Sequence, residues 1–177
     1  IVPRGRALGV TFSLPEKDVY AHTSDWYFDR LVIMFGGYAA EILVYGVTTS
    51  GAQGDISQAT SIVRRMVCEW GMGQDVGTIA WGNDNEPLFL GKELAMRHSY
   101  SEQTASAIDR DMKNIIDKAR GKAIELLTKH REQLEQLTSL LLEKETLNDA
   151  EIRQHLDLPA RKENEEDEMA FPASSVD

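Results

Sequence analysis

Apolar residues that recur every three or four positions over residues 99–144 constrain the fold of this chain more than any other feature. They are Ile108, Met112, Ile115, Ala119, Ala123, Leu126, Leu134, Leu137 and Leu141. This spacing places them on one face of an α-helix, which needs another surface to bury that face. A capping-box pattern at Ser99 and Glu102 predicts the helix start. Gly121 indicates a bend or break, so the segment can form two helices.

Similar patterns predict helices over about residues 24–45, 52–70 and 149–155. In the first of these, Gly36 and Gly37 weaken the helix, and we expect close approach of another backbone to compensate. The second helix has an apolar stripe that we expect to be buried, formed by Ile56, Ala59, Val63, Met66 and Trp70.

The remaining segments contribute little regular structure. Residues 8–14 have strand-like residue types and end at Pro15, and residues 73–97 suggest a loop with one hairpin. The prediction is therefore a mainly α fold with a short strand or small sheet near the N-terminus. We expect one domain over residues 1–158 and an acidic, disordered tail over residues 159–177.

Composition excludes several classes of protein. The net charge is −10, so no basic surface is available for nucleic acid. No apolar run approaches the roughly 20 residues that cross a bilayer, so we expect a soluble chain without a membrane segment. Cys68 is the only cysteine. It lies on an apolar helix, which favours a buried core thiol over a nucleophile.

No complete catalytic motif is present in the sequence. The histidines are His22, His98, His130 and His155, and none belongs to a His-Glu-x-x-His motif. We interpret the last three as solvated residues. The glycine-rich segment 51–55 lacks the lysine of a phosphate-binding loop, so ATP binding by this chain is not expected.

Asp55 allows two interpretations. It lies in the first turn of the second predicted helix, where the helix dipole favours an acidic residue. A carboxylate held at a helix start can also act as the third ligand of a catalytic zinc. The residues alone leave both interpretations open.

Seven segments, taken in order, resemble the FtsH family of AAA+ zinc metalloproteases. They cover residues 3–158 and are Arg4-Gly5-Arg6-Ala7-Leu8-Gly9-Val10-Thr11, Phe35-Gly36-Gly37-Tyr38-Ala39-Ala40-Glu41, Thr48-Thr49-Ser50-Gly51-Ala52-Gln53-Gly54-Asp55, Met66-Val67-Cys68-Glu69-Trp70-Gly71-Met72, Phe89-Leu90-Gly91, Tyr100-Ser101-Glu102 and Leu142-Glu143-Lys144-Glu145-Thr146-Leu147.

The resemblance implies roles for individual residues. It makes Asp55 the third zinc ligand, beside two histidines of a His-Glu-x-x-His motif expected upstream of Ile1. Glu41 is expected near the site, either orienting a ligand histidine or serving as a structural carboxylate. Separately, the strand containing Gly9, Val10 and Thr11 is a candidate for holding substrate by backbone pairing.

The resemblance also implies properties of a parent protein. That parent is a homo-hexamer in the bacterial inner membrane, with this domain on the cytoplasmic side. It binds ATP and Mg in a separate ATPase domain and degrades unfolded or short-lived membrane and soluble proteins. Without the missing base and histidine ligands, we expect the isolated chain to be inactive. The alternatives are a non-catalytic FtsH-like homologue or oligomerisation module, and an unrelated helical adaptor.

Overall fold

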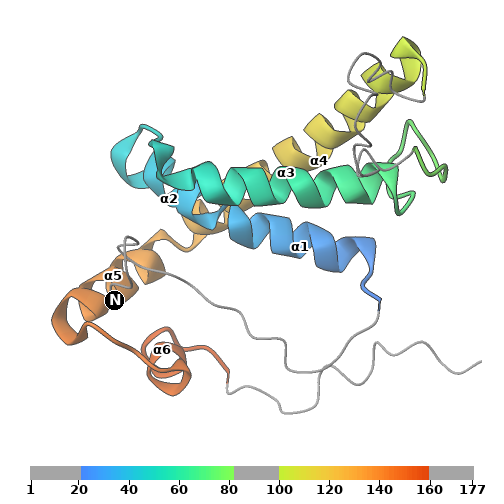
Figure 1. Ribbon diagram of the computed structural model, residues 1–177. Helices are drawn as coiled ribbons and strands as arrows, with labels where there is room; N and C mark the ends of the chain where they lie inside the picture. The colour runs from blue at the N-terminus through green and yellow to red at the C-terminus, as the bar shows by residue number, and fades with distance from the viewer. Residues whose placement is uncertain (1–20, 82–99, 160–177) are drawn as a thin grey trace, which may run out of the picture. The chain divides into compact units, whose positions relative to one another are not determined.

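The computed structural model describes residues 21–81 and 100–159, and every regular element in these ranges is a helix (Figure 1). The described residues fall into two compact units, residues 21–130 and 131–159. The prediction of a mainly α fold is confirmed for these residues. The predicted strand over 8–14, with Gly9, Val10 and Thr11, lies outside them, as do most of the predicted hairpin and of the acidic tail.

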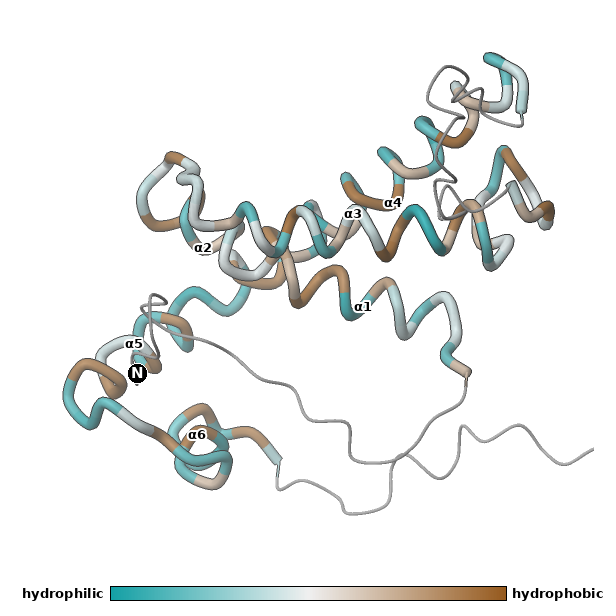
Figure 2. Tube along the Cα trace, in the orientation of Figure 1, coloured by the Kyte–Doolittle hydropathy of each residue, from teal (hydrophilic) through white to brown (hydrophobic). Residues whose placement is uncertain are grey.

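The larger unit is built around one long helix. Its elements in chain order are α1 (Ser24–Met34), α2 (Gly36–Tyr45), the short 3-10 helix η1 (Ser50–Ala52), α3 (Gln53–Cys68) and α4 (Glu102–Lys129). Helix α4 contacts α1, α2 and α3, and α1 also contacts α3. Apolar and polar residues alternate along these helices, as expected when each helix buries one face (Figure 2).

The first predicted helix is in fact two helices, so its prediction as one element is wrong. The division lies at Phe35, whose φ of −79° and ψ of 0° are not helical. No other described atom lies within 4 Å of a Cβ built on Gly36 or Gly37. Among the described residues, no backbone makes the close approach that was expected there. The glycines instead weaken the helix at the point where α1 gives way to α2.

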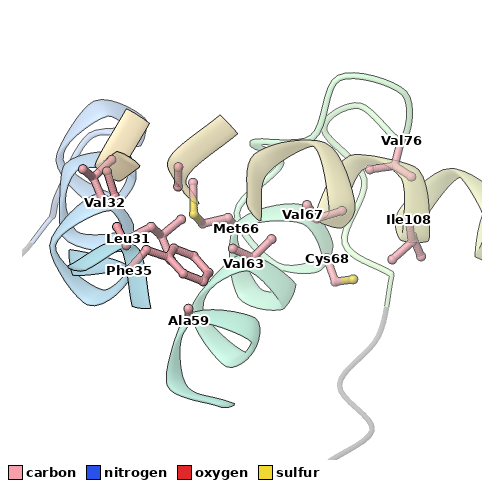
Figure 3. Close-up of a cluster of buried hydrophobic side chains, with 13 residues drawn as sticks. Leu31, Val32, Phe35, Ala59, Val63, Met66, Val67, Cys68, Val76 and Ile108 are labelled. Carbon is pink, nitrogen blue, oxygen red and sulfur yellow. The ribbon is translucent and has the colours of Figure 1, made fainter. Parts of the chain in front are cut away.

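The core of this unit lies between α1, α3 and α4 (Figure 3). Leu31, Val63 and Val67 are its largest fully buried side chains. On α3 the predicted burial of Ala59, Val63 and Met66 is confirmed.

Two predicted members of the α3 stripe are not buried. Ile56 is 42% exposed because it lies in the first turn of the helix, before the stretch of α3 that is buried. Trp70 follows the helix end and is half-buried, stacked on Tyr27 with ring centroids 4.5 Å apart. Val67 and Cys68 complete the buried stripe instead.

Helix α4 continues through Gly121, so the predicted break at that residue is wrong. The break lies at His130, the C-cap of α4. The start is capped by Ser101, whose side chain accepts a hydrogen bond from the Thr104 N–H at 3.2 Å. Ser99 lies outside the described residues, so the cap identified in the structure is the serine two positions further on.

The buried carboxylate of Asp111 holds the loop that follows α3. Asp111 is 3% exposed, and its Oδ2 accepts hydrogen bonds from the N–H groups of Asp75 at 2.9 Å and Val76 at 3.1 Å. On the outside of this contact, Arg110 pairs with the Asp75 carboxylate at 3.1 Å. Two backbone N–H groups thus satisfy a carboxylate oxygen that lies inside the protein.

The smaller unit contains α5 (Arg131–Lys144) and α6 (Asp149–His155). The predicted bounds of the last helix are confirmed. Asn148 and Glu151 form a capping box at the start of α6. None of the helices in residues 21–81 and 100–159 combines the length and apolar character needed to cross a bilayer.

Candidate metal-binding site

Asp55 is the third residue of α3 and is exposed to solvent. No hydrogen bond or ion pair joins its carboxylate to another residue in the described ranges. Both oxygens are therefore uncommitted at the N-terminus of a helix, where the helix dipole favours negative charge. Such a carboxylate can bind a cation without first breaking an internal contact.

The segment between α2 and α3 sets the position of Asp55. Gly46 is the C-cap of α2 and adopts the left-handed conformation with φ of 69°. Thr49 then caps η1 by accepting a hydrogen bond from the Gly51 N–H at 3.1 Å. Ala52, the last residue of η1, is buried. Because α3 begins at the next residue, η1 and Ala52 fix where the first turn of α3 lies.

Glu41 lies on α2 and is half-buried. Its carboxylate accepts two hydrogen bonds from Thr49, one from the N–H at 2.9 Å and one from the hydroxyl at 2.8 Å. The structure therefore joins two of the segments singled out in the sequence. A contact between Glu41 and a ligand histidine stays a prediction.

The described residues supply part of a zinc site at most. A catalytic zinc takes three protein ligands and a water, and residues 21–81 and 100–159 hold no group of three His, Cys, Asp or Glu side chains that could bind a metal. Asp55 fits as a single oxygen ligand because its carboxylate is exposed and uncommitted.

The other candidate side chains from the sequence are the histidines and Cys68. His22 stacks on Trp26 with ring centroids 3.6 Å apart. His130 and His155 are exposed, as predicted, and His98 lies outside the described residues. Cys68 is 6% exposed, which confirms that it is a buried thiol.

Sequence reasoning missed two residues that shape this part of the chain. Thr49 appeared only as part of a motif, although a threonine just before a helical turn is a common cap and could have been recognised. Asp111 gave no such signal, because its partners lie 35 and 36 residues away in the sequence.

Comparison with known families identifies the chain. A profile of peptidase family M41 matches residues 1–155. The chain belongs to peptidase family M41. The chain is 46% identical over 163 residues to a protein named "ATP-dependent zinc metalloprotease FtsH" from Borreliella burgdorferi, an alignment that covers 92% of this chain. It is 45% identical over 157 residues to a protein of the same name from Thermotoga maritima, which covers 88% of this chain.

The M41 chain spans 26% of the length of each of these two relatives. The resemblance to FtsH-type proteases, drawn from the seven sequence segments, is thereby confirmed. The family match covers residues 1–155 as a whole and does not test the role of any single residue. The roles of Asp55 and Glu41 stay predictions.

Proposed function

We propose that this chain is part of the proteolytic domain of an ATP-dependent, membrane-anchored zinc metalloprotease, and that Asp55 is one of its zinc ligands. The match of residues 1–155 to peptidase family M41 carries this proposal. The printed names of the relatives describe ATP-dependent zinc metalloproteases. The exposed, uncommitted carboxylate of Asp55 supports the assignment of that residue.

In the parent protein, zinc would activate a water for attack on a peptide carbonyl. This chain supplies Asp55 to hold the metal, and the two histidine ligands and the general base come from elsewhere. ATP and Mg bind to a separate ATPase domain. The parent is a homo-hexamer of the bacterial inner membrane, with this domain on the cytoplasmic side. Its substrates are unfolded or short-lived membrane and soluble proteins.

The segment Gly9, Val10 and Thr11 is proposed to hold substrate by adding it as a strand to a sheet edge. Backbone hydrogen bonds of this kind accept many sequences, which suits a protease that acts on unfolded chains. Proline at Val10 removes an N–H donor. In the intact protein, Val10→Pro should abolish peptide cleavage while Val10→Ala retains it. Equal turnover by both variants would contradict this role.

The zinc assignment can be tested in the full-length protein with Asp55→Asn. The expected result is loss of bound zinc and of casein hydrolysis, because an amide is a weaker ligand than a carboxylate. Asp25→Asn is a matched control, since Asp25 is an exposed aspartate in the first turn of α1. If Asp55→Asn retains zinc as well as Asp25→Asn does, Asp55 is not a ligand.

The isolated chain should neither retain zinc nor cleave casein. One carboxylate does not hold a zinc ion against dialysis, and water needs the bound metal to become a nucleophile at neutral pH. Metal analysis of the purified 177-residue chain measures the first expectation. Casein cleavage that a chelator abolishes would refute the second.

A second candidate function is a non-catalytic homologue or oligomerisation module. The exposed apolar side chains at the end of α2 favour it: Val44 is 48%, Tyr45 73% and Val47 60% exposed. Exposed residues of this kind can contribute to subunit contacts. Zinc-dependent cleavage by the full-length protein would decide for the protease. Absence of cleavage together with a stable oligomer would decide for the module.

A further inference from the structure

The segment of chain that precedes Asp55 is hydrogen-bonded to a glutamate on α2, Glu41. Both carboxylate oxygens of Glu41 are engaged by Thr49, eight residues later: Oε2 by the backbone N–H and Oε1 by the hydroxyl. Hydrogen bonds to an ionised carboxylate are shorter and stronger than those between neutral groups. Glu41 on α2 therefore holds Thr49 by two hydrogen bonds, one from its backbone and one from its side chain.

The same threonine also hydrogen-bonds the start of η1, so its contacts with Glu41 restrain that turn as well. Its hydroxyl donates to Glu41 and accepts from the Gly51 N–H at 3.1 Å. A hydroxyl that donates to an anion becomes a better acceptor, so the two bonds strengthen each other. Glu41, Thr49 and Gly51 form one connected set, which we call the Glu41 clamp.

The space around Gly51 shows how closely the clamp approaches the backbone. A Cβ at Gly51 would lie 3.1 Å from the Thr49 hydroxyl oxygen and 3.6 Å from Glu41 Oε1. The first of these distances is tighter than most side-chain contacts, so a side chain there would displace Thr49.

The clamp connects directly to the first turn of α3. Thr49 is the N-cap of η1, and η1 runs into α3 at Gln53 without an intervening loop residue. Asp55 follows two residues later. Because Thr49 is hydrogen-bonded to Glu41 and Ala52 is buried, the segment before Asp55 has little conformational freedom.

We propose that Glu41 is a positioning residue for Asp55, acting through Thr49 and the start of α3. The inference rests on the proposed function, in which Asp55 binds zinc. It differs from orientation of a ligand histidine by Glu41, because the carboxylate here acts on the aspartate's own segment of chain. Loss of such supporting contacts typically lowers metal affinity about 10- to 100-fold.

The experiment uses the full-length protein and measures zinc affinity by competition with a chelator. We expect Glu41→Gln and Thr49→Val each to weaken zinc binding at least about tenfold, and Thr49→Ser to restore near-normal affinity because it keeps the hydroxyl. The double variant should lose little more than either single one, since both changes break the same contact.

Two matched controls separate the clamp from general effects. Thr23→Val removes a threonine cap from α1, where the Thr23 hydroxyl accepts from the Trp26 N–H. Glu69→Gln changes another half-buried glutamate, which pairs with Arg65 at the far end of α3. Neither control should alter zinc affinity.

Hydrogen exchange of the metal-free protein supplies a second readout. Glu41→Gln and Thr49→Val should increase the exchange of amides 49–55 about tenfold or more relative to the controls, because opening of the segment becomes easier. Normal zinc affinity and unchanged exchange in both variants would overturn the inference.

The outcomes distinguish the two proposals. If Asp55→Asn loses zinc while the Glu41 and Thr49 variants bind it normally, the clamp proposal fails and the zinc assignment stands. If Asp55→Asn binds zinc normally, the zinc assignment fails, and the positioning role of Glu41 fails with it. Faster exchange would then show only that Glu41 orders the segment.

Discussion

Gly73 lies so close to Asp111 that a Cβ at position 73 would be 2.6 Å from the Asp111 Oδ2 atom. The same Cβ would lie 2.5 Å from a methyl group of Val76. Asp111 Oδ2 also accepts the hydrogen bonds from the N–H groups of Asp75 and Val76. The loop after α3 can therefore reach the buried carboxylate on α4 only because residue 73 has no side chain.

Gly73→Ala should accordingly destabilise the protein by about 1–3 kcal/mol, the usual cost of forcing extra atoms into a packed site. Urea unfolding measures the change. Gly121→Ala is the matched control, because no described atom lies within 4 Å of its Cβ position in α4. That change should stabilise the helix by up to about 1 kcal/mol. Equal effects of both substitutions would contradict the close approach at Gly73.

Asp111→Ala should destabilise the protein by at least about 1–3 kcal/mol, because it leaves the buried N–H of Val76 without an acceptor. Faster hydrogen exchange at the Val76 amide should accompany the loss of stability. The exposed Asp109 on the same helix provides the control. Asp109→Ala should change the free energy of unfolding by no more than about 0.5 kcal/mol. If both variants unfold alike, the carboxylate of Asp111 does not hold the loop.

Gly51→Ala should loosen the Glu41 clamp without removing any of its polar groups. The added methyl would press on the Thr49 hydroxyl, 3.1 Å away, and lengthen its bond to Glu41. We expect faster amide exchange over residues 49–55 in the metal-free protein, measured by mass spectrometry. Gly54→Ala lies in the same segment with open space at its Cβ position, and it should leave exchange unchanged or slower. The opposite order of the two variants would count against the geometry of the clamp.

The capping box of α6 should make the start of that helix sensitive to acid. The carboxylate of Glu151 accepts the Asn148 N–H at 3.0 Å and pairs with Lys144 at 3.2 Å. The backbone bond first, and Lys144 second, lower the pKa of Glu151 from its ordinary value. A lowered pKa in the folded state means that the contact stabilises at neutral pH and is lost as the pH falls through that pKa.

An NMR titration tests this expectation. The amide shift of Asn148 should follow the protonation of Glu151, with a midpoint below that of an unstructured glutamate. Glu151→Gln keeps a hydrogen-bond acceptor at the same position but cannot titrate in this range. Its Asn148 amide should therefore lose the transition. An unchanged transition in that variant would assign the effect to another group.

Local patterns predicted the helices well, because apolar spacing reports which face is buried. They placed α6 within its observed bounds and identified Ala59, Val63 and Met66 as buried. The division of residues 24–45 was missed because Gly36 and Gly37 carry the same sequence signal whether they permit a close contact or weaken a helix. The break at His130 was missed for a related reason. No strong helix-breaking residue marks it, whereas Gly121 is tolerated inside α4.

The candidate site was only partly predictable. Asp55 and Glu41 were identified through motif resemblance, and the spacing of residues could not show that Glu41 reaches Thr49. That contact depends on the turn at Gly46, which brings residue 49 back to α2. Asp111 could not have been found, because an aspartate beside an apolar helical stripe looks like a boundary residue until its distant loop partners are known.

The burial of Cys68 has a practical consequence. It is the only thiol in the sequence, it is 6% exposed, and its backbone carbonyl accepts the N–H of Trp81 at 2.9 Å. A thiol reagent can reach the sulfur only when this region opens, so the labelling rate reports how often it does so. The 177-residue chain thus contains its own single-site reporter, and opening of the loop after α3 can be timed in it without introducing a foreign dye site.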